Sequence, residues 1–375
     1  MRGTYCYLPI LPARKGAFRA MDVLSPPARS RLTPLFDVPS PVLKGNETIE
    51  VYLAERAQGI HRACGTMRPM YVDVHDLPLD LHTSSDTQPI VHLFDLLRMH
   101  SSLAVPVTGT EADRDKDYLE SVRSIVARDR RGVCLRLTED DLAERQTLGA
   151  ATAAVLDFLA IGPSELDVIL DFGHVGNRNP DTLGGTAYEA LRAIHRIGRF
   201  RNIVVAGGSV PGNLGKRDLG KIRRESRIEF ALWTQLASML PDQMPIAFGD
   251  YGVIGAHYVP PGKAVNVPPR IRYTTLLDHV FYRAARGEYP LICRQLVASS
   301  DFADMNFSAG DRRIYRCANG LVNPGAPVDW VANDTNHHLE LVSEQAWRFL
   351  HEANLIDRFV LPEPQHFPWL QVELV

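Results

Sequence analysis

Cysteine is scarce in this sequence, and its spacing excludes the common cysteine-based architectures. The 375-residue chain has five cysteines, odd in number and widely separated, at Cys6, Cys64, Cys134, Cys293 and Cys317. No Cys-x-x-Cys pair occurs, so neither a disulfide framework nor a structural zinc site is expected. The apolar runs around Cys6 and Cys134 indicate small core residues at these two positions.

Long apolar segments are also lacking. The longest stretch, residues 151–161, is well short of the roughly 20 residues that a membrane-spanning helix needs. The N-terminus does not combine an apolar signal region with a small-residue cleavage site. We therefore expect a cytoplasmic protein with no membrane partner.

The chain has no excess of charge of one sign. Its 41 lysines and arginines nearly balance 44 aspartates and glutamates, for a net charge of −3, so there is no chain-wide basic field and nucleic acid is not an expected partner. We interpret the local basic stripe as the solvated face of a helix, with nucleic-acid binding as the alternative. The stripe consists of Lys216, Arg217, Lys221, Arg223, Arg224 and Arg227.

The sequence does contain a repeated alternation of short apolar runs, rich in β-branched residues, with segments of helical spacing. The eight runs are residues 5–11, 32–38, 70–74, 103–108, 133–137, 166–172, 202–206 and 245–249. The helix candidates between them are residues 47–63, 113–127, 139–159, 187–197 and 220–240.

This alternation predicts parallel strands covered by helices, because parallel strands need long crossover connections. A doubly wound open sheet is the rival, but residues 12–16 after the first run do not match the Gly-rich dinucleotide fingerprint. We therefore expect an α/β fold, with a (β/α)8 TIM-like barrel at residues 1–258.

The character of the sequence changes after Tyr258, where a Pro-rich stretch cannot propagate a helix. We expect residues 259–375 to form an α+β elaboration that packs on the barrel and contributes to its mouth. The expected elements are a helix at 274–286, a strand at 289–296, loops holding 310–313, a loop ending at 333–338 and a final helix near 343–353.

Polar residues gather where the strands of the predicted barrel end, and this is the end at which barrel enzymes carry their sites. Unpaired charges are costly to bury, so these groups are expected to be solvated, paired with one another or used in function. The group consists of Arg14, Lys15, Asp37, Asp73, His75, Asp76, Arg136, Asp171, His174, Ser209, Asp250 and Tyr251.

Two of these residues could bind a metal ion together. Asp73 and His75 alternate along the third run, so their side chains should point the same way. This arrangement would suit a shared divalent metal ion, and a plain hydrogen-bonded pair is the alternative. For Asp37 and Asp171, capping a helix or pairing with Arg136 is the alternative to a ligand-binding role.

The turns after the seventh and eighth runs are rich in glycine, at residues 207–216 and 249–255. Barrel enzymes often bind phosphate with these two loops. Tight strand-to-helix turns are the alternative interpretation, and the Asp250 carboxylate would repel a phosphate unless a cation intervened. A phosphate site is therefore one of two open interpretations.

The C-terminal part adds two polar clusters, Gly310-Asp311-Arg312-Arg313 and Asn333-Asp334-Thr335-Asn336-His337-His338. Adjacent histidines in an extended segment face opposite ways, so at most one should reach a common site. An acid–base role for one histidine stands beside a structural role for both. There is no Gly-x-Ser-x-Gly, Walker loop, His-Glu-x-x-His or kinase motif set.

At these residues the sequence resembles the phage-type Beta protein family of bacteriophages and bacteria. The resemblance runs nearly end to end. Its motifs are Pro9-Ile10, Arg14-Lys15-Gly16, residues 34–39, Asp73, Arg136, Leu170-Asp171, Ser209-Val210-Pro211, residues 248–251, residues 272–274, residues 310–314, Gly320, Asn323-Pro324, Trp330 and Asn336-His337-His338. It implies a barrel protein and suggests phage–host conflict, including phage defence, as its setting.

Together these features favour an enzyme that acts on a small anionic substrate, phosphorylated or nucleotide-like, at the mouth of the barrel. A metal-assisted hydrolase or phosphoryl-processing enzyme is the expected type. The expected catalytic residues are Asp73, Asp171, Asp250, His337 and His338. The expected substrate-binding residues are Arg14, Lys15, Asp37, Arg136, Ser209, Tyr251 and Arg312. The alternative is a non-catalytic module that binds a ligand or a protein partner.

Overall fold

Eight parallel strands close into a barrel in the computed structural model, which describes residues 3–43, 45–78, 80–110, 114–144, 146–212, 220–240, 244–256, 268–284 and 288–361. The strands are β1 (Tyr7–Pro12), β2 (Leu35–Asp37), β3 (Pro69–Asp73), β4 (Leu103–Thr108), β5 (Val133–Leu137), β6 (Leu166–His174), β7 (Asn202–Gly208) and β9 (Ala247–Asp250). Parallel pairing of β9 with β1 closes the ring. The predicted (β/α)8 barrel and its eight apolar runs are confirmed.

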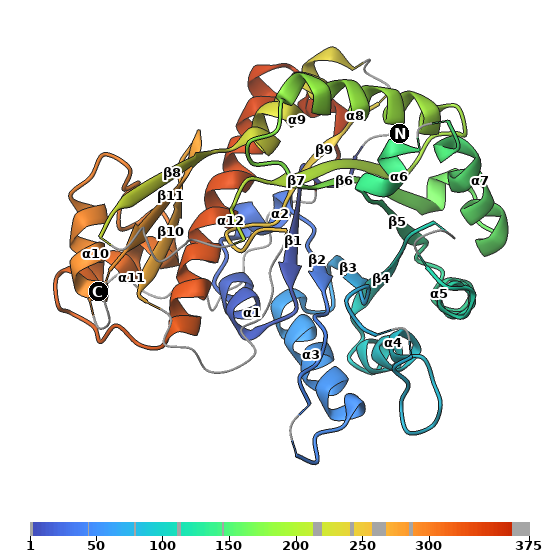
Figure 1. Ribbon diagram of the computed structural model, residues 1–375, viewed down its shortest axis with the longest axis horizontal. Helices are drawn as coiled ribbons and strands as arrows, with labels where there is room; N and C mark the ends of the chain where they lie inside the picture. The colour runs from blue at the N-terminus through green and yellow to red at the C-terminus, as the bar shows by residue number, and fades with distance from the viewer. Residues whose placement is uncertain are drawn as a thin grey trace.

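Helices surround the barrel and connect its strands (Figure 1). They are α1 (Lys15–Asp22), α2 (Pro26–Arg31), α3 (Ile49–Cys64), α4 (Pro89–Met99), α5 (Lys116–Asp129), α6 (Glu139–Ala143), α7 (Leu148–Leu159), α8 (Pro180–His195) and α9 (Ile228–Met239). Side-chain caps fix several starts: Thr48 accepts from Val51 N at α3, and Asp115 accepts from Tyr118 N at α5. Among the described residues, no helix is long and apolar enough to cross a membrane.

Strand register decides which side chains face the barrel interior. Pro12, Asp37 and Asp73 are aligned across β1, β2 and β3, while Asp171 is aligned with Gly249 through β7. Side chains alternate between the two faces of a strand. Phe248 of β9 packs on the aromatic rings of α9 and therefore points outward to the helices. Residues two positions away along β9 point outward as well.

A second, antiparallel sheet lies beside the barrel (Figure 1). It has the order β10-β11-β8 and consists of β8 (Ile222–Ser226), β10 (Arg270–Thr274) and β11 (Asp278–Arg283). Helices α10 (Tyr289–Val297) and α11 (Ala309–Ala318) pack on it around a separate apolar core. The long helix α12 (Pro327–Glu352) runs between this sheet and the barrel, so the expected α+β elaboration is present.

Several predicted elements of the C-terminal part are wrong. The expected helix at 274–286 is replaced by the hairpin of β10 and β11, because alternate residues such as Val280 and Tyr282 are buried in the second core. The expected strand at 289–296 is α10, which has Pro290 in its first turn, a position that favours a helix start. Residues 310–313 lie in α11 and residues 333–338 lie in α12, not in loops.

Two predicted helices of the barrel are also corrected. The segment 139–159 divides into α6 and α7. Between these helices the Thr147 hydroxyl donates a hydrogen bond to the Glu144 carbonyl, and this side-chain bond competes with the backbone bonds of a continuous helix. The segment 220–240 begins as β8, which pairs with β11. The basic stripe therefore lies partly on a strand, and its Lys216 and Arg217 fall outside the described residues.

The domain boundary expected at residue 258 stays a prediction. Strand β8 precedes that position in the chain but pairs with β11, which follows it. Helix α12 also contacts α1 of the barrel as well as β10 of the second sheet. The Pro-rich segment from 259 to 267 lies outside the described residues.

A pair of glycine substitutions tests the packing of α11 on α12. A Cβ at Gly310 would lie 2.2 Å from the Asn333 carbonyl oxygen, whereas one at the exposed Gly185 of α8 would meet no atom within 4 Å. We expect Gly310→Ala to lower the free energy of unfolding by about 1–3 kcal/mol through overpacking. Gly185→Ala should raise it by about 0.5–1 kcal/mol through helix propensity. Urea denaturation measures both, and a neutral Gly310→Ala would contradict the close helix contact.

Candidate functional site

Five inward-facing residues form a buried network at the carboxyl ends of the barrel strands: Asp37, Asp73, Arg136, Asp171 and Tyr251. We call this the mouth network. Arg136 is its centre, with Nε donating to Asp171 at 2.8 Å and Nη1 donating to Asp37 at 2.8 Å and to Asp73 at 2.9 Å. Its Nη2 donates to the Tyr251 hydroxyl at 2.9 Å.

The charges of the mouth network stabilise one another. Burial alone would lower the pKa of Arg136, but the surrounding carboxylates outweigh that effect and raise its pKa well above the ordinary value. Burial raises the pKa of Asp73, while Arg114 and Arg136 lower it more strongly, to about 2. Asp73 and Arg136 therefore stay ionised across the physiological pH range.

Arg114 and His75 extend the network, and Arg114 was missed by the sequence analysis. Arg114 Nη2 donates to Asp73 at 3.1 Å, and its Nη1 lies in hydrogen-bond contact with His75 Nδ1. The two arginines thus share Asp73 between them. Arg114 follows β4, the one strand whose end was given no candidate, and applying the strand-end rule to β4 would have found it.

Asp37 is the member of the network that is poised to exchange a proton. Burial raises its pKa to about 7, with further raising by Asp73, Asp76 and Asp171, and the Arg136 guanidinium opposes this only in part. Its side chain is still 24% exposed. A carboxyl with these properties can act as an acid or a base near neutral pH.

A cavity of about 310 Å³ opens at this end of the barrel. Its size is at the lower end of the range for sites of small ligands. Its walls combine apolar side chains with two carboxylates and two hydroxyls. The lining residues are Ile10, Pro12, Asp37, Pro39, Ser40, Asp76, Tyr251, Ile254, Gly255 and Ala256.

Arg14 and Lys15 lie where α1 begins, directly after β1. The N-terminal turn of α1 offers backbone N–H groups and the positive end of the helix dipole. Arg14 is the N-cap residue, its side chain has no acceptor with which to cap the helix, and the first turn has no acidic residue. Lys15 is exposed, and neither Arg14 nor Lys15 lines the cavity, although both closely follow Pro12, which does.

Asp250 lies on the opposite face of its strand and does not line the cavity. It shares the outward parity of Phe248, and it accepts a hydrogen bond from the Tyr7 hydroxyl at 2.7 Å. Its other oxygen lies 2.9 Å from His338 Nε2 of α12. His338 Nδ1 in turn lies 2.8 Å from the Thr274 hydroxyl. The structure therefore brings Asp250 and His338 together, outside the barrel wall.

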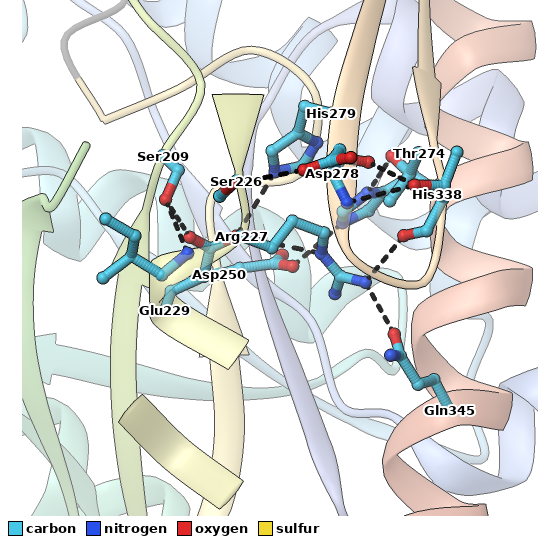
Figure 2. Close-up of polar contacts among 12 residues, drawn as sticks. Ser209, Ser226, Arg227, Glu229, Asp250, Thr274, Asp278, His279, His338 and Gln345 are labelled. Atoms are coloured by element: carbon cyan, nitrogen blue, oxygen red, sulfur yellow. Dashed lines mark hydrogen bonds and ion pairs between the residues drawn. The ribbon is translucent and has the colours of Figure 1, made fainter. Parts of the chain in front are cut away.

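Ser209 belongs to the same outer layer. Its hydroxyl donates a short hydrogen bond to Glu229, whose other oxygen lies 3.2 Å from His279 Nε2. Arg227 is buried beside them, and its Nη1 donates to the Thr275 carbonyl and to Gln345. We call the set Tyr7, Ser209, Arg227, Glu229, Asp250, Thr274, His279 and His338 the outer cluster. Figure 2 shows most of its members between the strands and α12.

Protonation in the outer cluster is set by burial and pairing. Burial raises the pKa of Asp250, but His338 and its hydrogen bonds outweigh this and lower it. Burial lowers the pKa of His338, and Asp250 offsets this only in part. The pair therefore consists of a carboxylate and a neutral imidazole that donates from Nε2 and accepts from Thr274 at Nδ1.

His337 and Arg312 lie in the second sheet's region of the molecule. His337 is fully buried, with Nδ1 2.8 Å from Asp311 and Nε2 2.8 Å from the Thr274 carbonyl oxygen. Arg312 lies on α11. Neither residue lines the cavity. The glycine-rich turn after β7 cannot be placed beyond Gly212, because residues 213–219 lie outside the described residues.

The carboxylates of the mouth network do not fit the expected divalent ion well. The oxygens of Asp37, Asp73 and Asp171 that face one another already accept hydrogen bonds from Arg136, a cation in the place a metal would take. Within the described ranges, no group of three or more His, Cys, Asp or Glu side chains has a metal-binding arrangement.

The closed ring of eight parallel strands, with a polar network at their carboxyl ends, makes this chain a TIM-barrel protein. The family model described as Beta protein matches residues 7–344. The chain therefore belongs to the Beta protein family, as the sequence motifs had predicted. A comparison with curated proteins gives no match.

Solved structures similar to this chain include two barrel enzymes of low sequence identity. Triosephosphate isomerase from Bartonella henselae has 9% identity and a TM-score of 0.36, over 66% of this chain and 94% of that chain. The Paramecium bursaria Chlorella virus arginine decarboxylase has 11% identity and a TM-score of 0.36, over 68% of this chain and 60% of that chain.

Removing the central cation tests the mouth network. Arg136→Met leaves three carboxylates facing one another, so we expect the free energy of unfolding to fall by about 3–5 kcal/mol at pH 8. The difference in free energy of unfolding between the wild type and Arg136→Met should be smaller at pH 5, because protonation of these carboxylates relieves their repulsion. The control Arg192→Met breaks an exposed pair with Glu189 and should cost less than about 0.5 kcal/mol. Equal losses in the two variants, measured by urea denaturation, would contradict the account.

Proposed function

We propose that this barrel is an enzyme that acts on a small anionic substrate in the mouth cavity, with Asp37 as its acid–base group. The observation that carries the proposal is the position of Asp37. Among the carboxylates that Arg136 holds, Asp37 is the one that lines the cavity. The other two, Asp73 and Asp171, position it through their shared arginine.

The chemistry of Asp37 supports this role. Its near-neutral pKa lets it accept a proton from water or a substrate hydroxyl and return the proton to a leaving group. Tyr251 lies beside it at the cavity, and the buried Tyr251 hydroxyl donates to Asp171 at 2.5 Å. Hydrolysis or phosphoryl processing, the reaction types favoured by the sequence, both need such a group.

The α1 corner supports an anionic substrate. The anionic group would lie against the first turn of α1, with Arg14 and Lys15 supplying positive charge. Asp76 also lines the cavity and would repel an anion at its own side. The substrate would therefore direct its anionic group towards α1 and its reacting group towards Asp37.

Ligand-dependent stability tests where the substrate binds. We expect the thermal midpoint to rise with at least one member of a panel of inorganic phosphate, sugar phosphates and nucleotides, because a ligand selective for the native state stabilises it. The rise should be lost in Lys15→Ala. A panel that leaves the midpoint unchanged would contradict an anionic substrate.

Turnover of the stabilising compounds tests the enzyme assignment. Asp37→Asn should bind them as the wild type does and lose about 10²–10⁴-fold in rate, the contribution of a positioned acid–base group. The control Asp157→Asn changes an exposed residue of α7 and should keep the full rate. Binding without turnover in the wild type would support the alternative, a non-catalytic binding module.

A further inference from the structure

The outer cluster and the mouth network meet at one short turn, at the end of β9. Asp250 points outward to α12, and the next residue, Tyr251, points inward to the cavity. Asp250 Oδ1 also accepts a hydrogen bond from the Gly252 N–H at 3.0 Å. This bond closes a turn around Tyr251, because an aspartate that bonds the N–H two residues on braces the residue between them.

We propose that His338 is a positioning residue for the mouth site: by holding Asp250, it fixes the turn that aims Tyr251 at Arg136 and Asp171. This inference rests on the proposed function, in which Asp37 is the acid–base group. His338 does not touch the cavity, so its influence passes through Asp250 and Tyr251.

In the outer part of this chain of contacts, Asp250 and His338 have their hydrogen-bonding atoms engaged. Asp250 receives hydrogen bonds from Tyr7, Gly252 and His338, so both of its oxygens are engaged. His338 is fully buried, and the Thr274 hydroxyl orients its ring from β10. Buried polar groups with every partner in place hold a unique arrangement.

Burial keeps the His338 ring neutral by lowering its pKa, and His279 and Arg227 add to this effect while Asp250 opposes it. His279 stacks on it with ring centroids 5.8 Å apart, and Arg227 stands near both Asp250 and His338. Glu229 faces His279 and Arg227 on the far side of the cluster. A neutral His338 can donate from Nε2 and accept at Nδ1 together, as its two partners require.

The inner part of the chain leads to Asp37. Tyr251 donates to Asp171 at 2.5 Å and accepts from Arg136 Nη2 at 2.9 Å. Arg136 Nη1 holds Asp37 at 2.8 Å. If the turn loosens, Tyr251 leaves the cavity wall and water reaches Asp37. The desolvation that raises the pKa of Asp37 is then lost, and the pKa falls.

A titration of Asp37 in the full-length protein tests the inference. Aspartate labelled at the carboxyl carbon is followed by ¹³C NMR, and the Asp37 resonance is assigned by its absence in Asp37→Asn. His338→Ala should lower the titration midpoint of Asp37 by at least one pH unit, a tenfold loss of proton affinity. Tyr251→Ala removes the ring from the cavity wall and should do the same from the inner side. His338→Gln keeps an N–H donor for Asp250 and should stay close to the wild-type midpoint.

The control His351→Ala changes an exposed position of α12 and should leave the midpoint unchanged. If His338→Ala does not fold, His338→Asn shortens the side chain so that no donor reaches Asp250, and it gives the same comparison. A folded His338→Ala or His338→Asn with the wild-type midpoint overturns the inference and leaves the proposed function standing. A wild-type Asp37 that titrates near pH 4 overturns the acid–base role itself.

Discussion

The guanidinium of Arg136 is the group on which the mouth of this barrel depends. It lies among three carboxylates and a tyrosine hydroxyl, at the carboxyl ends of the barrel strands. Without this cation, three neighbouring carboxyl groups would be buried with no opposite charge among them to offset the cost. Its four hydrogen bonds hold these groups in place, and the cavity wall beside them is formed by Asp37 and Tyr251 and not by Arg136 itself.

Strand parity divides the polar residues of the barrel into two layers. The inward layer is the mouth network. The outward layer joins the barrel to α12 through Asp250 and, by way of Ser209 and Glu229, to His279 of the second sheet. Because successive residues of a strand face opposite sides, Asp250 and Tyr251 serve different layers although they are adjacent in the chain. This explains how a helix far along the sequence contributes to the mouth without entering it.

The barrel could be predicted from the sequence because its strands are continuous apolar runs separated by helices. The strand ends predicted the five members of the mouth network as candidate site residues, and pairing of Asp37 and Asp171 with Arg136 was one alternative to their ligand-binding role. The orientation of Asp250 could not be predicted, since it depends on where β9 ends and which helix covers it. The C-terminal elements were misjudged because burial in a second core decided between helix and strand there.

The stability of the wild type relative to Asp37→Asn, measured from pH 4 to pH 8, tests the central claim most directly. Asp37 has a pKa of about 7 in the folded protein against 3.8 ordinarily. Its raised pKa contributes stability that is present below pH 4 and is lost as the pH rises to 7, whereas asparagine does not titrate. We expect the free energy of unfolding of the wild type to fall, relative to that of the variant, by up to about 1.4 kcal/mol per pH unit between pH 4 and pH 7. A difference that stays constant, or grows in favour of the wild type, would contradict it.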